Sequence, residues 1–223
     1  MNLSDQVKKE LADLASGGSI RIGASLTTGA HLLPGIINAY RDQMPHVDIF
    51  TQVDNTSLIE KLILEDQLDI GLVEGLIHSP HIAEETLCND DLVIICGPGH
   101  PFWEKAIVSI SELAGSAFII REQGSGTRDE FEKDMYEAGA EWKIAGVYNN
   151  TEAIKHAVRG NLGLAVVPKI SIEEEVARGV VRQIEVKGLK LKRKFNLVYH
   201  RQKFFTHALK TFIDCCKNYP LPS

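Results

Sequence analysis

Short apolar runs alternate with amphipathic segments along most of the chain. Apolar or alternating runs of four to eight residues are typical of β-strands. The runs that predict strands are SIRIGAS (19–25), HVDIFTQVDN (46–55), LDIGLVEG (68–75), DLVIICGPGHP (91–101), SAFIIREQ (116–123), KIAGVYNN (143–150), LGLAVVPK (162–169), VVRQIEV (180–186) and KRKFNLVYHR (192–201). Since strands alternate with helices, the pattern predicts an α/β fold with at least partly parallel sheets.

Apolar residues spaced three or four apart predict the helices. These segments are 3–16, 28–41, 56–67, the stretch after Ser125, 151–160, 171–179 and 204–219. We expect Thr27 or Thr28 to cap the second of them, because hydroxyl side chains satisfy the free N–H groups of a helix start. Proline has no N–H, so Pro34 is expected in the first turn of a helix.

Composition restricts the class of protein without naming it. The 223 residues carry 24 basic and 30 acidic side chains, which gives a net charge of −6. An acidic chain lacks the positive charge that attracts the phosphates of nucleic acid. No apolar stretch reaches membrane-span length, and the polar start has no signal-peptide core. The cysteines, at 88, 96, 215 and 216, lack metal-site or disulfide spacing, which favours the cytoplasm.

Three strand-to-helix turns carry short polar residues. They are Ser25-Leu26-Thr27-Thr28, Gly124-Ser125-Gly126-Thr127 and Asn149-Asn150-Thr151. Ligands of open α/β sheets collect at the carboxyl ends of the strands, where such turns meet. Plain helix capping is the alternative explanation for each turn. Three such turns in one chain favour a small-molecule cleft.

The Gly124–Arg128 turn has the chemistry of an anion site. Its two glycines permit positive φ and close backbone approach, and Ser125 and Thr127 add hydroxyl donors. Arg128 can add a fork for an oxyanion, although a capped helix with a surface arginine remains the alternative. Gln123 and Thr127 break the nucleophile pattern G-x-S-x-G, and the third glycine of a dinucleotide fingerprint is missing.

Other polar clusters favour structural explanations. His78 and His81 have no third metal ligand at a supporting spacing, so a loop is expected there. A basic run predicts the solvent-exposed face of an edge strand, because its charged residues alternate with others. It consists of Lys187, Lys190, Lys192, Arg193 and Lys194. No catalytic triad or carboxylate pair stands out, and the sequence predicts neither an enzyme nor a cofactor or metal.

The segments SIRIGASLTTGAHLLPGIINAYRDQMPHVDI, LDIGLVEG, GPGHPFW and GNLGLAVVPK together resemble the effector-binding domain of LysR-type transcriptional regulators. The resemblance covers about residues 18–215. It implies two Rossmann-like α/β subdomains joined by two crossover strands, as in type 2 periplasmic binding proteins. Subdomain I is expected at 18–92 plus 198–223, and subdomain II at 93–197.

The resemblance also implies how the domain assembles. Residues 1–17 resemble the end of the linker helix that normally carries a winged helix-turn-helix, which this chain does not include. DNA contact is therefore expected only through that missing domain. In the family, the helix at 28–41 packs against subdomain II of a partner, so we expect a homodimer. Leu32, Leu33, Ile36, Ile37 and Tyr40 of this helix offer more apolar surface than one core stripe needs.

The resemblance implies a ligand sensor that binds a small anionic metabolite in the cleft between subdomains. The expected effector-binding residues are Ser25, Leu26, Thr27, Thr28, Gly124, Ser125, Gly126, Thr127, Arg128, Asn149 and Thr151. Two alternatives stay open. A solute-binding protein of a transporter shares this topology but needs a secretion signal or lipid anchor, and an enzyme on the same scaffold needs an acid, base or cofactor lysine in the cleft.

Overall fold

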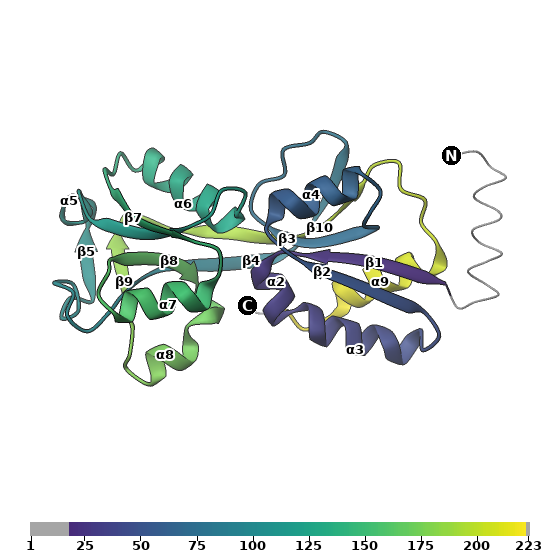
Figure 1. Ribbon diagram of the computed structural model, residues 1–223, viewed down its shortest axis with the longest axis horizontal. Coiled ribbons are helices and arrows are strands. Elements are labelled where there is room, and N and C mark those ends of the chain that lie inside the picture. Colours follow the sequence, from purple (N-terminus) through teal and green to yellow (C-terminus); the bar gives the residue numbers. More distant parts are fainter. Residues whose placement is uncertain (1–17, 222–223) are drawn as a thin grey trace. The chain divides into compact units, whose positions relative to one another are not determined.

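The computed structural model describes residues 18–221, which divide into two compact units (Figure 1). Unit 1 comprises the described residues up to Cys88 and from Lys194, and unit 2 runs from Asn89 to Arg193. The chain passes between the units in two strands, β4 (Ile82–Cys96) and β10 (Lys192–His200). The helix predicted at 3–16 lies outside the described residues.

Unit 1 is built on the strand order β2-β1-β3-β10. Its remaining strands are β1 (Ser19–Ala24), β2 (Asp48–Val53) and β3 (Ile70–Glu74). β1 runs parallel to β2 and β3, with Ala24 opposite Leu72, whereas β10 is antiparallel to β3. Because parallel strands end at the same edge, the residues that follow Ala24 lie beside the end of β3.

Helices cover both faces of this sheet (Figure 1). They are α2 (Leu26–His31), α3 (Leu33–Gln43), α4 (Thr56–Leu64) and α9 (His207–Asn218). On one face, Tyr40 of α3 meets Phe212 of α9 edge to face at 5.5 Å between ring centroids. α4 covers the other face through Ile59 and Ile63.

The segment predicted as one helix at 28–41 is two helices, α2 and α3, separated at Leu32. Pro34 is the second residue of α3, as its position in a first turn requires. The expectation that Thr27 or Thr28 caps the helix is wrong. Ser25 holds the capping position of α2, and both threonines are helical residues with buried side chains.

Unit 2 has the strand order β4-β8-β6-β7, with β9 pairing both β4 and β5. Its strands are β5 (Ile107–Ser109), β6 (Ala117–Arg121), β7 (Lys143–Tyr148), β8 (Leu164–Pro168) and β9 (Arg182–Lys187). β6 runs parallel to β7 and β8, with Arg121 opposite Tyr148. The connections that follow β6 and β7 therefore start at the same edge of the sheet.

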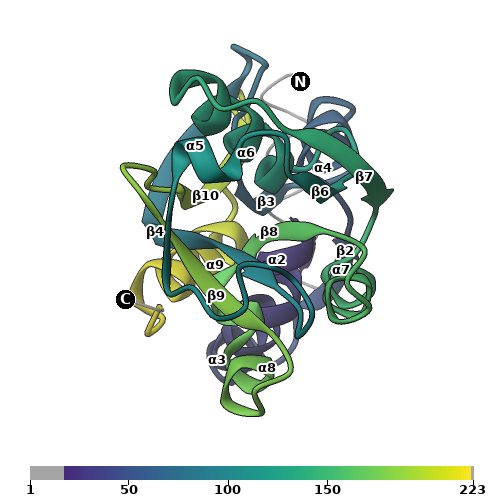
Figure 2. The same ribbon diagram turned by 90° about the vertical axis from the view of Figure 1, so that its left-hand side faces the viewer.

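The helices of unit 2 also lie on two faces, as Figure 2 shows. They are α5 (Ile110–Leu113), α6 (Gly126–Glu137), α7 (Thr151–Arg159) and α8 (Glu173–Ala177), with a 3-10 turn, η1 (Lys169–Ser171). Phe131 and Met135 anchor α6 in one apolar cluster, and Ile154 and Val158 anchor α7 in the other. Nowhere in residues 18–221 is there a helix long and apolar enough to cross a membrane.

Two features of the strands differ from the sequence prediction. β4 begins at Ile82 rather than at residue 91, because its first half, IAEETLCNDD, is mostly polar and carries no apolar run. The short pair β5 and α5 is not predicted at all, since three strand residues are too few to show a period.

Candidate functional site

A tight turn connects β6 to α6. Gly124 has a φ of +83°, a left-handed conformation that glycine adopts without steric cost. Ser125 follows at the capping position, with extended backbone angles, and Gly126 is the first helical residue. Of the two glycines that permit positive φ, Gly124 adopts it and Gly126 does not. The turn aims the first N–H groups of α6 outward, together with the positive end of a helix dipole.

Two buried polar atoms of this connection have no hydrogen-bond partner among the described residues. One is Ser125 Oγ, in a residue that is 2% exposed, and the other is Arg121 Nη1, in a residue that is 3% exposed. Arg121 uses Nε and Nη2 to bind the carboxylate of Glu122 at 2.8 Å each. Leaving a buried polar group unpaired costs about 1–3 kcal/mol. Both atoms can donate a hydrogen bond, so each would be satisfied by an acceptor oxygen.

Thr127 is backed by a buried arginine. Arg193 Nη1 donates to Thr127 Oγ1 at 2.6 Å, and Arg193 Nε donates to Asp90 Oδ2 at 2.6 Å. Since the threonine oxygen accepts from a cation, its own hydrogen is left to donate to a different group. The expectation that Arg193 lies on a solvated strand face is wrong. Arg193 is 2% exposed and points inward between the exposed Lys192 and Lys194.

Arg128 forms hydrogen bonds within unit 2, to α6 and to the end of β6. Its Nε binds Glu132 Oε1 at 2.8 Å, and its Nη1 donates to the carbonyl of Arg121 at 3.3 Å. Part of the guanidinium fork that the sequence assigns to a ligand is therefore occupied by the protein itself.

The corresponding turn of unit 1 contains a carboxylate that the sequence prediction omits. Ser25 Oγ and Thr27 Oγ1 both donate to the buried carboxylate of Glu74, Thr27 at 3.1 Å. Thr28 Oγ1 donates to the carbonyl of Leu72 at 2.5 Å. A signal for Glu74 was present, because it ends the run LDIGLVEG and parallel neighbours end at the same edge.

The third predicted turn, before α7, is a capped helix start. Asn150 Oδ1 accepts the N–H of Ala153 at 2.8 Å, which is the geometry of an N-cap. Asn150 also donates to Asn149 Oδ1 at 3.1 Å, and Thr151 is the first helical residue. Glu122 N–H bonds the carbonyl of Tyr148 at 3.0 Å, so this turn and the turn before α6 begin at one edge of unit 2.

A buried lysine, Lys155, connects α7 to η1 and α8. Lys155 Nζ lies 2.6 Å from carboxylate oxygens of Glu152 and Glu175 and donates to the carbonyl of Ser171 at 3.0 Å. Burial opposes its charge, but the hydrogen bonds to the two glutamates outweigh burial and raise the pKa of Lys155 above its usual value. Glu152 therefore has a structural partner.

The predicted site residues thus fall into two sets. Ser25, Leu26, Thr27 and Thr28 lie in unit 1, and the remaining seven lie in unit 2. Arg121, Glu74, Asp90 and Arg193 join these sets as buried charged neighbours that the sequence prediction leaves out. Within residues 18–221, no group of three or more histidine, cysteine or acidic side chains is arranged to hold a metal ion.

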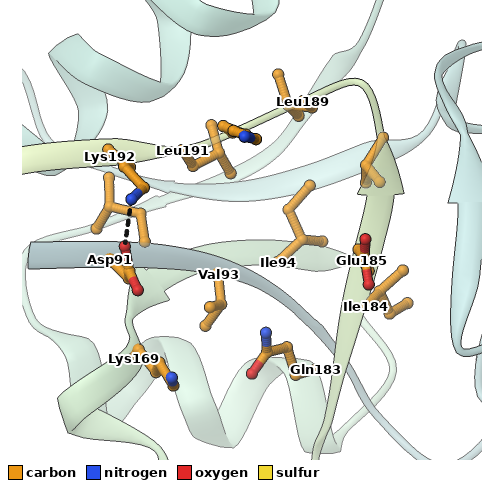
Figure 3. Close-up of a pocket in the computed structure, with 13 residues that line it drawn as sticks. Asp91, Val93, Ile94, Lys169, Gln183, Ile184, Glu185, Leu189, Leu191 and Lys192 are labelled. Carbon is orange, nitrogen blue, oxygen red and sulfur yellow. Dashed lines mark ion pairs between the residues drawn. The ribbon is translucent and has the colours of Figure 1, made fainter.

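Unit 2 also has a hollow of about 290 Å³ between β4 and β9, shown in Figure 3. Apolar side chains such as Val93 and Leu189 line it, and an ion pair between Asp91 and Lys192 at 3.8 Å lies at its edge. None of its lining side chains carries a buried polar atom without a partner. The β6–α6 connection is therefore the stronger candidate for a ligand site.

Comparison with known proteins identifies the class. Residues 15–220 match the family described as the LysR substrate binding domain, and the chain belongs to that family. A similar relative is an uncharacterized HTH-type transcriptional regulator, YeiE, from Escherichia coli strain K12. The two are 34% identical over 214 residues, which are 96% of this chain and 73% of the relative. The chain is an effector-binding domain of a LysR-type regulator, which confirms the expected family.

Solved structures confirm the expected two-subdomain fold of type 2 periplasmic-binding-protein kind. The regulatory domain of CcmR from Synechocystis PCC6803, in complex with 2-PG, superposes with a TM-score of 0.81 at 22% identity, covering 90% of this chain and 96% of that one. The effector-binding domain of QuiR in complex with shikimate gives 0.82 at 21% identity, covering 91% and 96%.

Proposed function

We propose that this domain senses a small anionic metabolite, which binds at the start of α6. The single observation that carries the proposal is Ser125 Oγ, a buried hydroxyl without a partner at the positive end of a 12-residue helix. Arg121 Nη1 and the hydrogen of Thr127 supply two further donors in the same connection. All three groups suit an oxyanion, and none is an acceptor-only group that would repel one.

Binding of this kind fits a sensor rather than a catalyst. The Escherichia coli relative is described as a transcriptional regulator, and the CcmR and QuiR domains were solved with small molecules bound. A sensor needs only that the ligand favours one conformation of the protein over another. We propose that the domain works in this way in the cytoplasm, with DNA contact made by a separate winged helix-turn-helix domain. A solute-binding role with a transporter is the second candidate, and the family match disfavours it.

Replacing Ser125 with alanine tests the proposal. For an anion that stabilises the wild type, Ser125→Ala should raise the dissociation constant about tenfold, because one hydrogen bond to a charged group is lost. Isothermal titration of both proteins with the same anion measures the change. Ser57→Ala, at the start of α4 in unit 1, is the control and should bind as the wild type does. Equal affinity of Ser125→Ala and wild type would contradict the proposal.

We also propose a homodimer, on a basis different from the sequence expectation. Leu32, Leu33, Ile36 and Tyr40 are buried in the core of unit 1 and offer no surface to a partner. Exposed apolar side chains lie instead on the outermost strand of each unit's order. They are Phe50 and Val53 on β2, and Ile144 and Val147 on β7. Exposed apolar edge strands favour association, which supports an interface that includes β2 and β7.

Phe50, which is 54% exposed, is the residue to change. Phe50→Asp should shift the chain from a species of about twice 24.7 kDa to a monomer, because a charge is placed in an apolar interface. Sedimentation equilibrium at about 50 µM, a concentration at which interfaces of standard size are occupied, measures this. Tyr136→Asp on α6 is the control: Tyr136 is 87% exposed and lies on no edge strand. A wild type that sediments as a monomer would contradict the dimer.

A further inference from the structure

Three arginines of unit 2 lie at the connection between β6 and α6, and each is paired with a carboxylate. The pairs are Arg121 with Glu122 at 2.8 Å, Arg128 with Glu132 at 2.8 Å and Arg193 with Asp90 at 2.6 Å. Arg193 belongs to this group because it also donates to Thr127 Oγ1. Since each cation has an anion in contact with it, the three arginines supply hydrogen-bond donors but little surplus positive charge.

The helix that follows the connection is itself acidic. α6 carries two basic and five acidic side chains, a net charge of −3, and Asp129 lies in its first turn. These negative charges affect one another, because burial and, after it, the charge of Glu130 raise the pKa of Asp134 above its usual value. The dipole of the helix offsets only about half a charge at its start. These groups of unit 2 therefore give the helix start no net positive charge.

Hydrogen-bond donors are nevertheless available at this helix start. Ser125 Oγ and Arg121 Nη1 are buried and have no partner among the described residues. Such donors, together with the helix dipole, accommodate one negative charge without a free cation beside it. A second negative charge would be repelled by the carboxylate of Glu122, whose side chain is mostly buried, and buried charges are poorly screened by water.

We propose that the start of α6 selects singly charged oxyanions, such as carboxylates and sulfate esters, over doubly charged ones, such as phosphate esters. This proposal rests on the proposed function, in which an anion binds there, and adds the charge of that anion. Glu122 has the largest influence on the preference, because it neutralises Arg121, the arginine with the unpaired donor. Glu122 acts through Arg121 and does not itself contact the anion.

The probes are esters that share a shape and differ in charge. Methyl sulfate is compared with methyl phosphate, and phenyl sulfate with phenyl phosphate, by titration calorimetry on the whole chain at one ionic strength. At about pH 8 the phosphate esters are doubly charged, since their second pKa is about 6, whereas the sulfate esters carry one charge. Both kinds of ester present three terminal oxygens, so the number of available acceptors is the same.

Two substitutions of Glu122 separate its charge from its hydrogen bonds. Glu122→Gln keeps one acceptor oxygen for Arg121 but removes the charge, so the preference for the sulfate ester should shrink about tenfold. Glu122→Asp keeps the charge and should keep the preference. Glu174→Gln is the control, because it changes the net charge of unit 2 equally but removes an exposed partner of Arg178 on α8. It should bind both esters as the wild type does.

The expected result is a wild type that binds the sulfate ester of at least one pair about tenfold or more tightly than the phosphate ester. Equal affinity, tighter binding of the phosphate esters or binding of neither kind would overturn the proposal, and this comparison needs no variant. A preference that persists in Glu122→Gln would overturn it as well.

Ser125→Ala, titrated alongside, distinguishes this proposal from the proposed function. If the wild type prefers a phosphate ester and Ser125→Ala weakens its binding, the charge preference is wrong and the proposed function stands. If Ser125→Ala binds every ester as the wild type does, the proposed function fails.

Discussion

Arg193→Met is expected to lower the free energy of unfolding by about 3–5 kcal/mol, because it leaves the buried carboxylate of Asp90 without its cation. Arg193 Nε and Asp90 Oδ2 lie 2.6 Å apart, and both side chains are almost completely buried. The same change removes the donor to Thr127 Oγ1. Urea unfolding followed by circular dichroism measures the loss, with the slope of the transition compared to show that the mechanism of unfolding is unchanged.

The chain contains a matched control one residue away on each strand. Lys192 and Asp91 form an ion pair at 3.8 Å, drawn in Figure 3, in which both side chains are about half exposed or more. Lys192→Met removes the same type of interaction from solvent and should cost less than about 1 kcal/mol. If Lys192→Met and Arg193→Met lowered the free energy of unfolding equally, burial of the Asp90–Arg193 pair would make no difference to stability, which would contradict this prediction.

Gly97→Ala is the second substitution with a large expected effect, about 3 kcal/mol or more of destabilisation, because backbone must move to admit the new methyl group. A Cβ at residue 97 would lie 2.1 Å from the carbonyl oxygen of Val158, near the end of α7. This contact gives a physical reason for the first glycine of GPGHP. Thermal unfolding monitored by circular dichroism measures the change in melting temperature.

Gly99→Ala is its control within the same turn. There a Cβ would meet only the side-chain amide of Asn161, at 3.4 Å, so the change should alter the free energy of unfolding by less than about 0.5 kcal/mol. A Gly97→Ala protein as stable as Gly99→Ala would contradict the close packing of β4 against α7.

Periodicity predicts most of the elements that frame the site. The apolar runs AFIIR and LAVVP predict strands, and both are buried along almost their whole length. The glycine at 124 predicts the turn before α6. Pro34 likewise predicts a helix start close to its observed place, because the constraint is local to the proline.

Long-range partners account for what the sequence does not predict. Asp90 and Arg193 are 103 residues apart in the sequence. A basic residue between two lysines is predicted to be exposed unless it is known that the strand directs its side chain inward. Glu74 is similar, since its effect on Ser25 and Thr27 depends on β1 and β3 being neighbours. The polarity of a site, donor or acceptor, is set by such contacts rather than by the hydroxyl residues themselves.

A thermal-shift screen by charge class tests the central claim, that this domain senses a small anion, most directly. The wild-type chain is heated with small organic anions, cations and uncharged apolar compounds of similar size, all at one ionic strength. We predict that at least one anion raises the melting temperature in a saturable way and that no other class does so, because ligands stabilise only the state that binds them. Stabilisation by cations or apolar compounds alone would contradict the claim.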